Sequence, residues 1–131
     1  MKNKIIVIGR KSFLGSNLCL YLKKKNFILN VDYKTFIKKK LIIINNFDYV
    51  INCTSNHDYI ENKYLKKNDF DLAIANKIKK LNIKMIMLSS RKVYKNGINL
   101  KETSTLNPIS NYSKNKLKTE KALLEILKKK I

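Results

Sequence analysis

The stretch KIIVIGRKSFLG, residues 4–15, decides the fold of this chain. Lys4 to Ile8 is a short run of aliphatic residues that predicts a buried strand, and Gly9 closes it. Arg10-Lys11-Ser12 then gives a helix-start signal. Apolar residues follow with helical spacing, at Leu14, Leu18, Tyr21 and Leu22. A strand that passes through a glycine turn into a helix is typical of the first unit of a doubly wound α/β sheet.

The same stretch has the chemistry of a phosphate loop. The first N–H groups of a helix lack partners within the helix, so they can bind the pyrophosphate of a dinucleotide. Gly9 permits the turn and Gly15 lets the helix pack on the strand, while Ser12 stands at the small middle position. We expect Gly9, Ser12 and Gly15 to bind the cofactor together with Lys11, Phe13 and Leu14. An ordinary strand-to-helix turn is the alternative interpretation.

Asp32 ends a second predicted strand, Phe27 to Asp32, and strengthens the cofactor hypothesis. An acidic residue about 20 positions after such a loop hydrogen-bonds the ribose hydroxyls of NAD. Arg10 and Lys11 favour the other cofactor, because a cation in this loop suits the 2′-phosphate of NADP. We therefore expect NAD, with NADP as the alternative.

Further strands and helices alternate along the rest of the chain. Strands are predicted over 48–54 and 84–89, and helices over 59–80, with a break near Asn68, and over 110–129. The β-branched residues of the segment 35–46 favour a strand. However, only Asn45, Asn46 and Phe47 separate them from the next predicted strand, which is too few for a crossover between parallel strands, so we predict a short helix. The fold class is thus a Rossmann-like, doubly wound parallel sheet of about four strands, with 1–131 as one dinucleotide-binding domain and no substrate domain.

The net charge of +20 is the most unusual feature of the composition. Such a charge often indicates nucleic-acid binding. However, 27 of the 29 basic residues are Lys, and they are scattered among many Ile and Asn, which indicates biased codon usage rather than a partner. Nucleic-acid binding is therefore kept only as an alternative.

The purely aliphatic runs are too short to span a bilayer and no secretory signal is evident, so we expect no membrane partner and a cytoplasmic protein.

Cysteine and histidine do not indicate a metal site. Cys19 and Cys53 lack the spacing of a metal or redox motif, and they are expected to be reduced, buried thiols. His57 is the one histidine of the sequence and is expected in a loop or at the surface.

The pattern Y-x-x-x-K occurs three times, at Tyr21/Lys25, Tyr59/Lys63 and Tyr112/Lys116, so the pattern alone indicates little in a chain so rich in lysine. The third pair differs by its context. It follows a serine-ended predicted strand, a long loop and Pro108.

Three segments resemble one known family. MLSSRKVY (87–94), NPISNYSKNKLKTEKAL (107–123) and VINCTSNHD (50–58) are similar to segments of the extended short-chain dehydrogenases/reductases. Within that group they resemble the NAD-dependent epimerases, dehydratases and dTDP-4-dehydrorhamnose reductases. The resemblance implies an NAD(P)-dependent enzyme acting on nucleotide sugars.

The resemblance also implies roles for individual residues. Tyr112 would be the acid/base, and the charge of Lys116 would favour the phenolate and bind the nicotinamide ribose. Ser90 would hydrogen-bond the reacting oxygen. Thr54 and Ser55 would line the cofactor groove, and Asn68 is a candidate for the asparagine of the proton relay. The alternatives are a packing role for Tyr112, a solvated Lys116 and a helix-capping Ser90.

The chain ends soon after Lys116, whereas the family has further strands and a region that closes over the nucleotide sugar. We therefore expect an unpaired sheet edge beside the strand at Lys84, and a homo-oligomer or a partner chain that completes the fold. Three hypotheses remain: the cofactor-binding part of an enzyme, a non-catalytic dinucleotide-binding module or degenerate fragment, and a basic nucleic-acid-binding protein.

Overall fold

A computed structural model describes residues 1–128 of the chain. Its centre is a parallel four-stranded sheet in the order β2-β1-β3-β4, which confirms the predicted fold class. The strands are β1 (Lys4–Ile8), β2 (Phe27–Val31), β3 (Tyr49–Asn52) and β4 (Lys84–Met87). The last three each end one or two residues before the predicted boundary. Those residues instead begin the loops at the carboxyl edge of the sheet.

The register of the sheet brings the carboxyl ends of the strands level. Ile8 pairs with Val31 on one side and with Asn52 on the other, and Asn52 pairs with Met87. As a consequence, the segments that follow the four strands leave the sheet at one edge, where ligands bind in folds of this kind.

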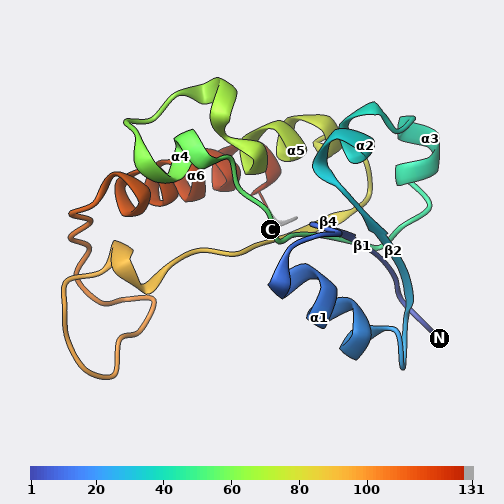
Figure 1. Cartoon of the computed structure of the whole chain (residues 1–131), viewed down its shortest axis with the longest axis horizontal. Helices are drawn as coiled ribbons and strands as arrows, with labels where there is room; N and C mark the ends of the chain where they lie inside the picture. The colour runs from blue at the N-terminus through green and yellow to red at the C-terminus, as the bar shows by residue number, and fades with distance from the viewer. Residues whose placement is uncertain (129–131) are drawn as a thin grey trace.

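Helices cover the two faces of the sheet unequally (Figure 1). Helix α1 (Phe13–Leu22) lies on one face, and α2 (Tyr33–Lys38), α5 (Phe70–Ile78) and α6 (Asn111–Leu127) lie on the other. The remaining helical elements are the short helices α3 (Leu41–Ile44) and α4 (His57–Glu61) and the 3₁₀ turns η1 (Lys66–Asn68) and η2 (Arg91–Val93).

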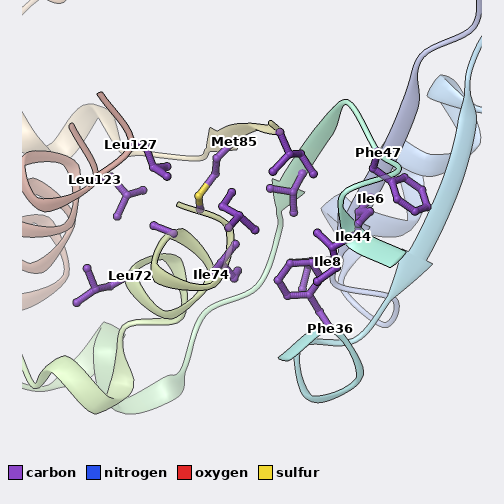
Figure 2. Packing of buried hydrophobic residues seen from close by; sticks show 14 of the residues in the cluster. Ile6, Ile8, Phe36, Ile44, Phe47, Leu72, Ile74, Met85, Leu123 and Leu127 are labelled. Atoms are coloured by element: carbon purple, nitrogen blue, oxygen red, sulfur yellow. The ribbon is translucent and has the colours of Figure 1, made fainter. Parts of the chain in front are cut away.

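The larger hydrophobic core lies beneath α5 and α6 (Figure 2). Strand residues Ile6, Ile8 and Met85 meet Ile74 of α5 and Leu123 of α6 there. Phe36 of α2 and Ile44 of α3 extend this core toward β2 and are fully buried. This core therefore fixes α5 and α6 on one face of the sheet.

The core under α1 is smaller. It contains Ile5, Val7, Ile51 and Cys19. The apolar residues with helical spacing do not all pack on the sheet, because Leu14 and Tyr21 are 49% and 72% exposed. Ser12 caps α1, and from that starting point the helix turns Gly15 and Cys19 toward the sheet instead.

The long helix predicted over 59–80 is broken into α4, η1 and α5, as the expected break near Asn68 required. The break has a local cause, because the side chain of Asp69 accepts a hydrogen bond from the Leu72 amide and starts a new helix. The segment 35–46 is helical as predicted, but it forms the two short helices α2 and α3. The predicted helix end at Lys129 lies outside the described residues, and α6 is described to Leu127.

Strand β4 lies at the edge of the sheet within residues 1–128. Ile86 of β4 points to the same face of the sheet as Ile51, which packs under α1. Ile86 is nevertheless 43% exposed, so this face is not covered as far as β4. No helix within residues 1–128 combines the length and apolar character that crossing a membrane requires.

Candidate functional site

The phosphate loop begins with Gly9 in a backbone conformation that favours glycine. Its φ is +123°, and a Cβ there would lie 3.3 Å from the Cys53 backbone. Three residues on, Ser12 caps α1 by accepting a hydrogen bond from the Gly15 amide at 2.8 Å. The serine that replaces a glycine in this loop therefore has a structural use, because its hydroxyl fixes the first turn of the helix.

The first turn of α1 is open to ligands. Phe13 is 86% exposed and Leu14 is 49% exposed, so neither side chain closes the space in front of the helix N-terminus. Lys11 is exposed in the same loop. Amides at the start of a ten-residue helix carry a partial positive charge, and the nearby cation reinforces it. The residues present thus fit the diphosphate of a dinucleotide.

Asp32 is exposed just beyond the end of β2, and it caps α2 by accepting a hydrogen bond from the Thr35 amide at 2.7 Å. That hydrogen bond is the main reason why the pKa of Asp32 is lowered, and Arg10 and Lys11 contribute to a smaller extent. The Gly9 amide donates a hydrogen bond to the carbonyl oxygen of Val31, the residue before Asp32, at 2.8 Å. This contact places Asp32 beside the phosphate loop. Asp32 is thus an ionised carboxylate at the position where a ribose is expected.

A cleft of about 240 Å³ opens at the carboxyl edge of the sheet. Four segments contribute to it: the start of α1, the ends of β3 and β4, and the first turns of α6. It is lined by Leu14, Asn52, Cys53, Thr54, Ser55, Leu88, Ser89, Tyr112 and Lys116. The fold therefore brings five of the predicted site residues into one cavity, although they are far apart in the sequence.

Within the cleft, Tyr112 and Lys116 lie one turn apart on α6. The Lys116 Nζ atom lies 5.9 Å from the centroid of the Tyr112 ring and 5.6 Å from that of Tyr59. Lys116 is only 3% exposed, so it is not a solvated surface lysine. An ammonium held between two aromatic rings is stabilised by their π faces.

Of the four candidates for the proton chemistry, Tyr112 and Lys116 line this cleft, whereas Ser90 and Asn68 do not. Ser90 caps η2, with its hydroxyl accepting a hydrogen bond from the Lys92 amide at 3.2 Å. Its neighbour Ser89 lines the cavity instead and donates to Glu120 of α6. Asn68 is buried at the end of η1 and is not among the lining residues.

Asp71 is a site residue that the sequence analysis missed. Its carboxylate accepts a hydrogen bond from Asn52 at 2.8 Å and pairs with Lys116 at 3.2 Å. Burial raises its pKa, and Lys116 and Asn52 oppose that rise. One feature of the sequence could have indicated Asp71. This residue directly precedes the apolar run LAIA, and the chain has only nine Asp and Glu residues, so a carboxylate next to a buried segment is unusual here.

Both cysteines have free thiols, and His57 is the exposed first residue of α4. Cys53 lines the cleft, and burial raises its pKa from 9.0 to about 11. At neutral pH it is therefore a protonated thiol and a poor nucleophile.

A larger cavity, of about 560 Å³, lies away from this chemistry, on another side of α6. Its wall includes Lys63, Lys114, Lys118 and Lys121, and the Lys118 ammonium lies 5.2 Å from the centroid of the Tyr64 ring. The candidate active site is the smaller cleft, because the phosphate loop and the Tyr112–Lys116 pair meet there.

Comparison with known proteins identifies the family and supports the fold. A family model described as the NAD dependent epimerase/dehydratase family matches residues 5–130. A search of curated proteins gives no significant match.

Several solved structures share the fold. A UDP-N-acetylglucosamine 4-epimerase from Methanobrevibacter ruminantium, in complex with UDP-N-acetylmuramic acid, has a TM-score of 0.77 at 23% identity, covering 99% of this chain and 52% of that one. A dTDP-4-dehydrorhamnose reductase from Clostridium acetobutylicum gives 0.70 at 21% identity, with 94% and 49% covered. A dTDP-glucose 4,6-dehydratase from Bacillus anthracis, in complex with NAD, gives 0.71 at 20% identity, with 97% and 51% covered. The chain thus spans about half the length of each.

Proposed function

The chain belongs to the NAD dependent epimerase/dehydratase family, and from that premise we propose that it is the NAD-binding part of an enzyme that modifies nucleotide sugars. The observation that carries the proposal is the cleft in which Leu14 of the phosphate-loop helix, Thr54 and Ser55 meet Tyr112 and Lys116. Solved structures of the same fold include a dehydratase with bound NAD and an epimerase with a bound UDP-sugar derivative.

Three parts of the chain bind the cofactor in this proposal. The amides at the start of α1 bind the diphosphate, and Asp32 hydrogen-bonds the adenosine ribose. Thr54 and Ser55 line the groove between the two ends of the cofactor. When bound, NAD supplies a hydride acceptor and NADH a hydride donor.

The proton moves through Tyr112. Its phenol oxygen exchanges a proton with a sugar hydroxyl or carbonyl, and the ammonium of Lys116 favours the phenolate electrostatically. Lys116 also hydrogen-bonds the nicotinamide ribose. Ser90 donates a hydrogen bond from its own O–H to the reacting sugar oxygen. That O–H is available as a donor because the Ser90 oxygen acts as the acceptor in its bond with the Lys92 amide.

NADH binding provides the first test, by calorimetric titration of the chain. Lys116→Met is expected to weaken binding by about tenfold or more, because a hydrogen bond from a charged donor is lost. Lys25→Met is the matched control, since it removes the lysine of another Y-x-x-x-K pattern from an exposed site beyond α1. Equal affinities for all three proteins would contradict the proposed site.

Turnover provides the second test, with UDP- and dTDP-hexoses in the presence of NAD or NADH. Conversion that is lost in Tyr112→Phe and retained in Tyr21→Phe would support an enzyme. NADH binding without conversion of any of these sugars would favour the non-catalytic module.

Nucleic-acid binding is a second candidate, and the lysine-lined cavity on α6 is the observation that favours it. Phosphate contacts make such binding strongly salt-dependent. This candidate would be supported if DNA affinity fell steeply with salt concentration and if the double variant Lys114→Gln/Lys118→Gln no longer bound DNA. An unchanged DNA affinity in that variant would remove it.

A further inference from the structure

Asp71 lies at the junction of three elements that form the cleft. It is the second residue of α5 and is 4% exposed. One carboxylate oxygen accepts from Asn52 at the end of β3 at 2.8 Å, and the other accepts from Lys116 of α6 at 3.2 Å. The carboxylate therefore connects the strand end that borders the cofactor cleft with the helix that carries Tyr112.

The position of Lys116 requires such a partner. A lysine side chain is long and flexible, and burying its ammonium is unfavourable unless an opposite charge and hydrogen-bond acceptors compensate. Here the ammonium is buried between the rings of Tyr59 and Tyr112 and contacts the Asp71 carboxylate. Aromatic rings attract a cation but accept no strong hydrogen bond, so Asp71 supplies the anionic anchor.

Other titratable groups nearby are engaged elsewhere or are neutral. Asp69 accepts hydrogen bonds from Tyr64 and Thr119 and caps α5. The Tyr59 hydroxyl is hydrogen-bonded to Thr119, and burial raises its pKa. Burial also raises the pKa of Cys53 at the end of β3. Asp71 is therefore the carboxylate in direct contact with the Lys116 ammonium.

We propose that Asp71 is a positioning residue, which holds the Lys116 ammonium in a fixed place in the wall of the cleft, beside Tyr112. The consequence for the reaction rests on the function proposed above. The placement of the ammonium does not rest on it, and the two can be tested separately.

The placement is tested by NMR of lysine ammonium groups in the unsubstituted chain, with the Lys116 signal assigned from Lys116→Arg. A buried, carboxylate-bound ammonium is expected to give a slowly exchanging signal, with a scalar coupling between its ¹⁵N nucleus and the Asp71 carboxylate carbon. A Lys116 signal that exchanges like those of exposed lysines would overturn the proposal. This measurement needs no substitution of Asp71 and no cofactor.

Asp71→Asn then tests the dependence on charge at nearly constant shape. In this variant the slowly exchanging Lys116 signal is expected to disappear. Where NADH binding is established, its affinity is expected to fall by about tenfold or more, as for loss of the lysine itself.

Two control variants separate positioning from stability. Asp58→Asn makes the same charge change at an exposed position of α4 and should alter neither readout. Asp69→Asn removes the buried carboxylate that caps α5, so it should destabilise the fold while leaving the Lys116 signal in place. If Asp69→Asn also abolished the signal, or Asp71→Asn left the signal unchanged, Asp71 would have no specific role in positioning Lys116. If the signals behaved as expected but no protein bound NADH, the proposed function alone would fail.

Discussion

A Cβ atom on Gly15 would lie 2.4 Å from the carbonyl oxygen of Gly9. The start of α1 is therefore packed directly on the turn that leaves β1, and the two glycines act as a pair. One permits the turn, and the other allows the helix to approach it.

Gly15→Ala is accordingly expected to push α1 away from the turn. We expect a loss of about 1–3 kcal/mol in the free energy of unfolding, the usual cost of overpacking against backbone, together with weaker NADH binding. Urea denaturation and calorimetry measure the two effects. Gly97→Ala is the matched control, because its Cβ would meet the nearest atom at an ordinary 3.5 Å. A Gly15→Ala variant as stable as Gly97→Ala would contradict the packing described here.

Thr119→Val should destabilise the region beneath α6. The Thr119 hydroxyl donates to Asp69 at 2.6 Å and also contacts the Tyr59 hydroxyl at 2.6 Å. Valine preserves the shape but leaves buried polar atoms without a partner, at a cost of about 1–3 kcal/mol. Thermal and urea denaturation measure the change. Thr119→Ser should retain most of the stability, and Thr103→Val, at an exposed site, should change it little.

Alkaline pH should weaken the fold through Cys53. Its pKa is raised by burial from 9.0 to about 11, so the folded state favours the protonated thiol. The associated stability is present below pH 9.0 and is lost as the pH rises toward about 11, because only the unfolded chain ionises freely across that range. Urea titrations at several alkaline pH values should give a shallower decline for Cys53→Ala than for the unsubstituted chain. An identical decline in both would show that Cys53 is not the group responsible.

Asp32→Asn should change cofactor preference without removing the cap of α2, since asparagine caps helices as well as aspartate does. Loss of the carboxylate is expected to weaken NADH binding and to reduce the repulsion of the 2′-phosphate of NADPH, with Arg10 and Lys11 nearby. Parallel titrations with both cofactors give the ratio of affinities. If the ratio of NADH to NADPH affinity equalled that of the unsubstituted chain, Asp32 would have no role in recognising the ribose.

Much of the fold was predictable because its determinants are local. The β1 boundaries, the glycine turn and the helical character of 35–46 follow from residue type and spacing over a few positions. The apolar residues of α1 with helical spacing do not all pack on the sheet, as the exposed Leu14 and Tyr21 show. Which residues of α1 face the sheet depends on where the Ser12 cap starts the helix and on how closely Gly15 lets the helix approach Gly9.

The candidate site was predictable in part, for a similar reason. Tyr112 and Lys116 are four residues apart on one helix, so their proximity follows from helix geometry alone. Asp71 could not be assigned, because its two partners lie 19 and 45 residues away. Equally, the sequence could not distinguish Ser89 from Ser90 as the residue that lines the cleft, because the choice depends on how the loop after β4 turns.

The sequence by itself determined the succession of strands and helices, the glycine turn into α1 and the position of Tyr112 and Lys116 one turn apart on a helix. These features depend on short-range sterics, hydrogen bonding and periodicity, which the order of residues specifies directly. Only the tertiary structure decided that a buried carboxylate of α5 holds the lysine of α6 at the end of β3. A contact of that kind depends on how distant segments pack, and packing is set by the shape of the whole core.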